Sequence, residues 1–248
     1  MKAQIVINDH SYTIELNKPY ADLSMAVSNV ARAWYINAPT FEPVVLGDWK
    51  GSVALGGAVN FFNVSFNPHA HGTHTETAGH ITKERHSINT HFKNPFTKSV
   101  LLTVTPKEGI VTFEHFLTQW EKASGEDWLD EVKSVIFRTE QHAVSLTREY
   151  SNTNWPFLAP EIGSFLRSSG IDHLIIDQPS VDQEEDGGAL ACHRSFWGPT
   201  PLESLHRTIT ELAHIPTDVS DGAYLLNLQV APLDNDAAPS RPILYRLI

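Results

Sequence analysis

The feature that most constrains the fold is a strand, a helix and a second strand that follow one another between residues 132 and 177. The segment from Val132 to Arg138 has the apolar, β-branched character of a strand. A helix is predicted to begin at Pro160, because proline suits the first helical position, and to end at Gly170. The segment from His173 to Asp177 is a short buried strand. Two strands joined in this way lie parallel in one sheet, which predicts an α/β protein.

The remaining elements are predicted from the spacing of hydrophobic residues. A hairpin is expected over residues 3–16, partly helical structure over 21–35 and a further helix over 113–122. Loops with short strands are expected over residues 39–57. The other strands are expected over residues 59–66, 99–105, 207–212, 223–231 and 242–247. No linker divides the 248 residues, so we predict one domain, 1–248, with a mixed central β-sheet flanked by helices.

Composition argues against several classes of partner. The formal net charge is -11, and lysine and arginine form no local cluster, which disfavours nucleic acid and anionic membranes. No apolar run approaches the length of a membrane span. The single cysteine, Cys192, leaves no intrachain disulfide framework and suits a reducing compartment. We therefore expect a cytoplasmic protein that acts on a small molecule.

Histidine is the unusual residue in this composition. The chain has 13 histidines, and six of them fall within 23 residues: His69, His71, His74, His80, His86 and His91. His74 and Glu76 are two residues apart, so on an extended segment their side chains point to the same side. Imidazole and carboxylate are common ligands of zinc and manganese. On spacing alone, a metal site and a solvated polar loop are about equally favoured.

The segment from Gly72 to His80 resembles the signature of the cyclase family, His-x-Gly-Thr-His-x-Asp-x-Pro-x-His. That family includes bacterial kynurenine formamidases and isatin hydrolase. Gly72, Thr73, His74 and His80 match the signature, whereas Glu76 stands in place of its Asp. The resemblance runs from about residue 20 to the end of the chain. It implies the swivelling β/β/α architecture of the family and a homo-oligomer, a dimer or tetramer, with sites near the subunit interface.

The first histidine of the signature is replaced in this chain by Ala70. That histidine is a metal ligand in the family, so the resemblance implies either a substitute ligand or a reduced site. His69 is the candidate substitute. In a plain extended segment His69 has the wrong parity to face the same way as His74, so a bulge would be needed. Pro68 favours such an irregularity.

Two further segments carry the resemblance. His193 matches a later family histidine that ligates metal, and Glu211 matches the family glutamate that binds or bridges metal. The segment 170–182, which includes Ser180, is similar to a family strand and loop. Arg138 ends a strand like one in the family, and the residues alone suggest that it pairs with an acidic loop such as 182–186.

The resemblance implies a metal-dependent amidohydrolase, similar to the arylformamidases. The substrate would be an arylformamide such as N-formylkynurenine, a cyclic amide or a lactone, cleaved by water that one or two zinc or manganese ions activate. His80 would be the acid/base residue. The expected metal ligands are His74, Glu76, His193, Glu211 and His69. Aromatic side chains such as Trp34 could wall an apolar pocket, and the expected substrate contacts are Phe61, Trp197 and Ser180. The alternative is a cyclase-fold protein that has lost catalysis and still binds a small molecule.

Overall fold

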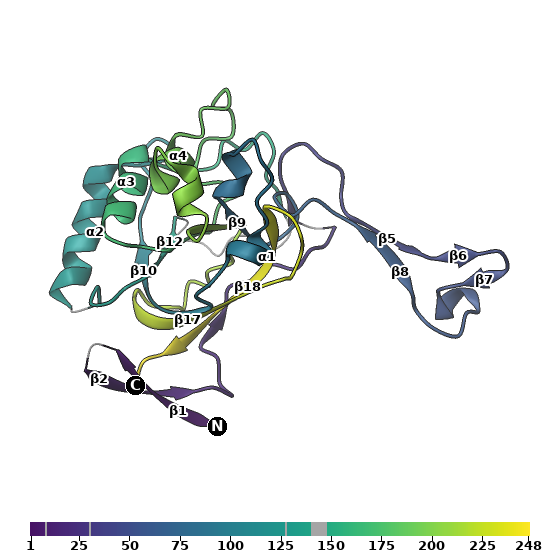
Figure 1. The fold of residues 1–248 in the computed structure, drawn as a ribbon, viewed down its shortest axis with the longest axis horizontal. Helices are drawn as coiled ribbons and strands as arrows, with labels where there is room; N and C mark the ends of the chain where they lie inside the picture. Colours follow the sequence, from purple (N-terminus) through teal and green to yellow (C-terminus); the bar gives the residue numbers. More distant parts are fainter. Residues whose placement is uncertain (8, 30, 127, 140–147) are drawn as a thin grey trace.

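A closed ring of strands forms the centre of the molecule (Figure 1). The structure is a computed structural model that describes residues 1–7, 9–29, 31–126, 128–139 and 148–248. Its main sheet has eight strands: β3 (Ala21–Asp22), β9 (His74–Thr77), β10 (Phe96–Thr103), β12 (Ser134–Arg138), β15 (His173–Ile176), β16 (Thr208–Glu211), β17 (Gly222–Val230) and β18 (Ala237–Arg246). The order is β17-β10-β12-β15-β16-β9-β18, and β18 pairs back with β17, so these strands close on themselves. β3 pairs with β18 at the margin.

The ring is a mixed sheet, as predicted. β10, β12, β15 and β16 run parallel to one another, and the remaining pairs in the ring are antiparallel. Helix α3 (Pro160–Ser168) lies between β12 and β15 in the chain, which confirms the strand-helix-strand unit. Pro160 occupies the start of α3, and Gly170 follows its end with a φ of +74°, a left-handed conformation that suits glycine.

Side chains of the ring strands alternate between two cores. On β12, Val135 and Phe137 pack with residues of the helices, whereas Ile136 packs with residues of neighbouring ring strands such as Leu101 and Ile175. A strand covered on both faces is apolar along its whole length, which is the pattern of the parallel segments here. The other helices are α1 (Ile88–His91), α2 (Phe113–Gly125) and α4 (Ala191–Trp197), with single turns η2 (Ala78–Ile81) and η3 (Pro201–Ser204). Figure 1 shows α2, α3 and α4 together on one side of the ring.

Short strand pairs decorate this body. β1 (Lys2–Ile7) and β2 (His10–Glu15) form the predicted N-terminal hairpin. Two parallel pairs of two residues each join distant segments: β4 (Ala31–Arg32) with β13 (Arg148–Glu149), and β11 (Ile110–Val111) with β14 (Phe157–Leu158).

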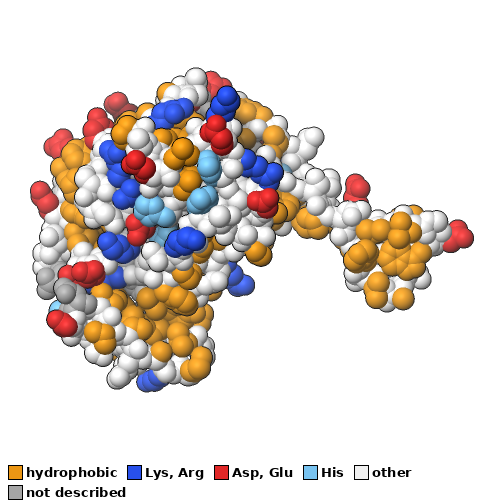
Figure 2. All heavy atoms as spheres, in the orientation of Figure 1, with side chains coloured by type: hydrophobic (Ala, Val, Ile, Leu, Met, Phe, Trp, Pro, Cys, Tyr) orange, Lys and Arg blue, Asp and Glu red, His pale blue; other side chains and the backbone are white. Residues whose placement is uncertain are grey.

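A long hairpin projects from the body, and we call residues 40–65 the arm (Figure 1). It contains β5 (Thr40–Pro43), β6 (Val45–Leu46), β7 (Trp49–Lys50), η1 (Val53–Leu55) and β8 (Phe62–Ser65). Figure 2 shows hydrophobic side chains gathered at its end. Its exposed apolar residues are Phe41, Val45, Leu46, Trp49, Val53, Leu55, Val59, Phe61, Phe62 and Val64.

The prediction of helical structure over residues 21–35 is wrong. The segment holds β3 and β4 with turns between them, and it contains no helix among its described residues. The Asp22 side chain accepts hydrogen bonds from the backbone N–H and the hydroxyl of Ser24. Such local side-chain bonds compete with helix formation. The other predicted strands are present with ends shifted by a few residues, and the helix α4 was not predicted. No helix in the described part of the chain has the length and apolar character needed to cross a bilayer.

Candidate metal centre

Strand β9 brings His74 and Glu76 to one side of the ring, and both side chains are fully buried. β16 pairs antiparallel with β9 in a register that sets Glu211 opposite His74. Side chains of directly opposed residues are neighbours on the same face. The His74 Nε2 atom accordingly lies 3.3 Å from a Glu211 carboxylate oxygen. The His74 Nδ1–H donates to the Gly72 carbonyl at 3.2 Å, so that Nε2 is the ring nitrogen turned toward the carboxylates.

Helix α4 brings His193 to the same place. The Asp182 carboxylate accepts hydrogen bonds from the backbone N–H groups of Cys192 and His193, at 2.7 and 3.1 Å. It also accepts from His193 Nδ1 at 2.6 Å. The opposite ring nitrogen, Nε2, then lies 3.0 Å from Glu76 Oε1 and 3.6 Å from Glu211 Oε1. Asp182 therefore orients His193 toward the two glutamates.

His69 reaches this centre because the chain turns before β9. The backbone N–H groups of Ala70 and His71 both donate to the Asn67 carbonyl, and the Asn67 side chain accepts from His69 N–H at 2.9 Å. Because of this turn, the alternation of side chains along a plain extended strand does not decide which way His69 faces. His69 Nδ1 lies 3.0 Å from Glu76 Oε2. His71 points elsewhere, with its ring between the Asn67 N–H and the Asn37 carbonyl.

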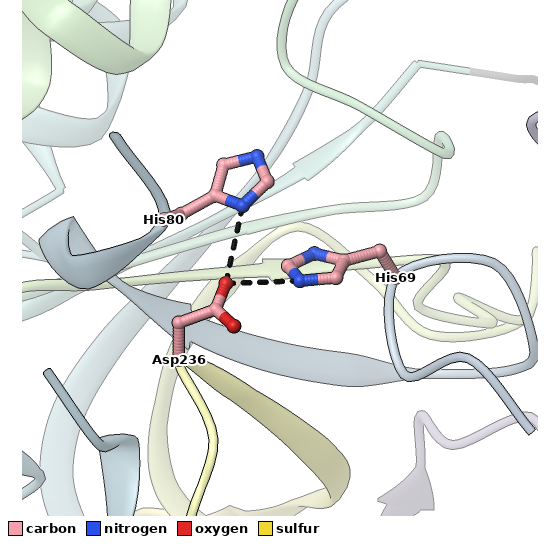
Figure 3. Close-up of side chains that lie close together, drawn as sticks. All are labelled: His69, His80 and Asp236. Carbon is pink, nitrogen blue, oxygen red and sulfur yellow. Dashed lines mark hydrogen bonds and ion pairs between the residues drawn. The ribbon is translucent and has the colours of Figure 1, made fainter. Parts of the chain in front are cut away.

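His80 lies beside His69, with ring centroids 4.5 Å apart. Both rings contact one carboxylate, that of Asp236, which precedes β18 (Figure 3). The Asp236 Oδ2 atom lies 3.0 Å from His69 Nε2 and 3.2 Å from His80 Nδ1. The predicted residues His69, His74, Glu76, His80, His193 and Glu211 therefore lie within one cluster, and two further carboxylates, Asp182 and Asp236, support it.

The charges of this cluster are strongly coupled. Burial raises the pKa of Glu76, but the nearby His80 and the hydrogen bonds from His193 and His69 outweigh burial and hold that pKa well below its ordinary value. Burial lowers the pKa of His69, yet hydrogen bonds to Asp236 and Glu76 raise it to about 10. The same opposition, with Asp182 and Glu76 as partners, leaves the pKa of His193 well above the ordinary range. Without a bound cation, imidazolium rings balance the buried carboxylates.

The donor set fits a divalent cation. His74 Nε2 is buried and makes no hydrogen bond in the described part of the chain. Buried polar atoms are rarely left so, and a missing ion is one explanation. The donor atoms of His69, His74 and Glu76 all lie within 4.8 Å of one another, as do those of Glu76, His80 and His193. Imidazole nitrogen and carboxylate oxygen are ligands for zinc and manganese.

A cavity of about 300 Å³ opens beside the cluster. His69, His80, His193 and Glu211 contribute its polar wall, and Ser180 also lines it. Its apolar wall comes from Trp34, Ile36 and Leu190. Trp34 is braced by an edge-on contact with Trp155 at 4.9 Å. The cavity thus offers an apolar surface next to the candidate metal ligands.

Two of the residues expected to contact substrate, Trp197 and Phe61, lie away from the cavity. Trp197 is buried in the core under the helices, where its indole N–H donates to the Arg207 carbonyl, and it lies behind His193. Phe61 is 59% exposed on the arm. Neither lines the cavity. Aromatic character alone could not distinguish a cavity wall from a core residue or a surface hairpin.

Comparison with known proteins adds family membership to this geometry. The family model described as "Putative cyclase" matches residues 21–183. The chain belongs to the cyclase family. Kynurenine formamidase from Bacillus cereus is 26% identical to it over 227 residues, covering 91% of this chain and 96% of the relative.

Two solved structures share this cyclase fold. One, described as a predicted metal-dependent hydrolase from Bacillus stearothermophilus, has a TM-score of 0.60 at 16% identity and covers 91% of this chain and 97% of its own. The other is isatin hydrolase A from Labrenzia aggregata, bound to benzyl benzoate, with a TM-score of 0.66 at 14% identity and coverage of 92% and 93%. The mixed α/β cyclase fold predicted from the sequence is confirmed.

Proposed function

We propose that this cyclase-family chain is a metal-dependent amide hydrolase that acts on an arylformamide such as N-formylkynurenine, or on a cyclic amide or lactone. The observation that carries the proposal is the convergence of His74, Glu76, His193 and Glu211 in a buried cluster, where His74 Nε2 has no hydrogen-bond partner among the described residues, beside a cavity with an apolar wall. The names of its relatives, kynurenine formamidase and isatin hydrolase, support amide hydrolysis.

In this proposal His74, Glu76, His193 and Glu211 hold the cation, with His69 as the replacement for the family histidine lost at Ala70. A bound divalent cation supplies Lewis acidity, which lowers the pKa of water and polarises a carbonyl. Glu76, one methylene longer than the Asp of the family signature, reaches both His193 through Oε1 and His69 through Oε2. With that double reach, the Glu76 carboxylate could hold one ion or two.

His80 is the proposed acid/base. Its Nδ1 is engaged by Asp236, so Nε2 is the nitrogen available to a substrate in the cavity that His80 lines. It would donate the proton that the leaving amine nitrogen requires when the carbon–nitrogen bond breaks. Trp34, Ile36 and Leu190 would hold the apolar part of the substrate against the opposite wall.

The test is hydrolysis of N-formylkynurenine, isatin and simple lactones with added zinc or manganese. His80→Ala should lower kcat by about 10²- to 10⁴-fold, the usual contribution of a positioned proton donor. His74→Ala should also lower the metal content of the purified protein. His91→Ala is the matched control, since His91 packs against His86 outside the cluster and should keep activity and metal. Turnover indifferent to His80→Ala would remove the acid/base assignment.

A second candidate is a cyclase-fold binding protein without catalysis. The replacement of the first signature histidine by Ala70, which is fully buried, favours it, because a site short of a ligand can lose its metal. This candidate predicts a protein that purifies without metal, is equally stable with and without chelator, and binds an aryl amide without turnover. Stoichiometric metal in the purified protein separates the two proposals.

We propose zinc or manganese as the metal, one domain over residues 1–248, and a cytoplasmic location in keeping with the free, buried Cys192. We also propose a homo-oligomer, because the apolar side chains of the arm face solvent in a single chain. Sedimentation of the intact protein tests this: a Phe61→Ser variant should dissociate, and a wild-type monomer would contradict it.

A further inference from the structure

Asp236 joins the two residues of the cluster whose roles differ most. One of its oxygens contacts Nε2 of His69 at 3.0 Å and Nδ1 of His80 at 3.2 Å (Figure 3). In the proposed function His69 is the replacement ligand and His80 the acid/base. In each ring the Asp236 carboxylate therefore contacts the nitrogen that does not carry the proposed role. The other nitrogen, Nδ1 of His69 or Nε2 of His80, is left for the metal centre or the substrate.

The other two histidine ligands show the same arrangement. His193 is held at Nδ1 by Asp182, and Nε2 then faces Glu76 and Glu211. His74 is held at Nδ1 by the Gly72 carbonyl, and Nε2 faces Glu211. His69 is held at Nε2 by Asp236, and Nδ1 faces Glu76. Metal-binding histidines generally carry such a partner, which fixes the tautomer and the ring orientation.

The backbone around Asp236 is well anchored. The Asp236 carbonyl accepts from the N–H of Thr77, at the end of β9, at 3.0 Å. The next residue, Ala237, pairs with Glu76 in the β18–β9 register. The Asn235 side chain donates to the Ala237 carbonyl, and the Asn235 backbone carbonyl accepts from Ile88 N–H. The carboxylate is thus positioned by the same strand that carries Glu76.

We propose that Asp236 is a positioning residue that makes His69 a metal ligand in place of the histidine missing at Ala70, and that orients His80 for proton transfer. The inference rests on the proposed function. His69 sits one residue away from the lost ligand on a turn, where its ring needs an external partner to face Glu76. Asp236 supplies that partner, and its contact with His80 couples the metal centre to the acid/base.

The experiment measures zinc affinity of the full-length protein by competition with a chromophoric chelator. Asp236→Asn keeps the shape and removes the charge. It should weaken zinc binding by about 10- to 100-fold, the usual effect of losing the partner of a ligating histidine. Asp234→Asn is the matched control: it is the same chemical change two residues away, on a side chain that is 85% exposed, and it should bind zinc like the wild type.

A double-mutant cycle separates positioning from direct ligation. If Asp236 acts through His69, Asp236→Asn should change zinc affinity by no more than about twofold in a His69→Ala background. At saturating zinc, Asp236→Asn should still lower kcat while KM stays within about twofold, because His80 has lost its partner. A fall in kcat without a matching change in KM would not follow from a merely structural role.

Two results would overturn the inference. One is an Asp236→Asn protein that binds zinc as tightly as Asp234→Asn. The other is a loss of zinc affinity on Asp236→Asn that is just as large in the His69→Ala background, which would make Asp236 a ligand itself. Wild-type protein that takes up no zinc would instead sink the proposed function, so the two failures are distinguishable.

Discussion

Loading a cation into this centre should displace protons, and the affinity should therefore rise with pH. A ligating imidazole must be neutral, whereas hydrogen bonds to Asp236 and Glu76 raise the pKa of His69 to about 10 in the metal-free protein, against the opposing effect of burial. Since pH 7.5 lies below that pKa, we expect the ring to be protonated there. Removing that proton costs about 3 kcal/mol at 1.36 kcal/mol per pH unit, which weakens binding by a factor on the order of 10² relative to the neutral ring.

The sign and the size can both be measured. As the pH rises toward 10, the apparent dissociation constant of the metal should fall about tenfold per pH unit for each proton displaced. His193, whose pKa is also raised well above its ordinary value by Asp182 and Glu76, should contribute a second proton. Calorimetry at pH 7.5 in two buffers of different ionisation enthalpy counts the released protons directly. Manganese is the suitable probe at higher pH.

The comparison with His69→Ala decides whether His69 is a ligand. That variant should release about one proton fewer per metal ion, and its affinity should depend less steeply on pH. His91→Ala should behave like the wild type, because its ring lies against His86 and away from the cluster. An equal proton count in wild type and His69→Ala would show that His69 stays protonated beside the ion, and the replacement-ligand assignment would be wrong.

Three further predictions concern stability and substrate binding. Gly72→Ala should destabilise the fold by about 2 kcal/mol or more, because φ is +78° and a Cβ would lie 2.8 Å from the Met25 carbonyl oxygen. Gly109 has a similar φ of +84° but open space around it, so Gly109→Ala measures the cost of the backbone conformation alone. Equal losses of the two variants in thermal unfolding would refute the steric argument. Arg138→Lys should lower the free energy of unfolding in urea by about 1–3 kcal/mol. Lysine keeps the charge, but one ammonium cannot make the guanidinium's bonds to Asp221, Thr103 and the Pro216 and Val219 carbonyls at once, and an unchanged midpoint contradicts this. Trp34→Ala should raise KM for aryl substrates about tenfold with kcat little changed, and an unaltered KM would exclude the proposed apolar wall.

Much of the ring could be predicted because its strands carry a local signal. The apolar runs at 99–105, 132–138 and 173–177 appear as parallel strands because strands covered on both faces need such runs. The closure of the ring could not be predicted, since the pairing of β17 with β18 is a property of the whole sheet. Helix α4 was missed because its seven residues are too few for a periodic pattern, and it starts after Leu190 in a left-handed conformation.

The candidate centre divides in the same way. His74 and Glu76 could be predicted from two-residue spacing on a strand, and His193 and Glu211 only through the family resemblance. Asp182 and Asp236 were not predicted as partners, because ordinary loop residues near a turn carry no such signal. Arg138 was expected to pair with an acidic loop such as 182–186, but it pairs with Asp221 at 2.8 Å, a contact between strand ends that spacing does not reveal.

The position of β9 between β16 and β18 has a consequence for metal choice. Two of the proposed ligands, His74 and Glu76, come from a strand that is hydrogen-bonded on both sides, so they cannot shift without the neighbouring strands. His193 lies in the short helix α4, and His69 lies on a turn, so neither belongs to a strand of the ring. Ions of different radius should therefore be accommodated by these two imidazoles alone. Structures with zinc and with manganese should superpose on β9 and differ at residues 69 and 193.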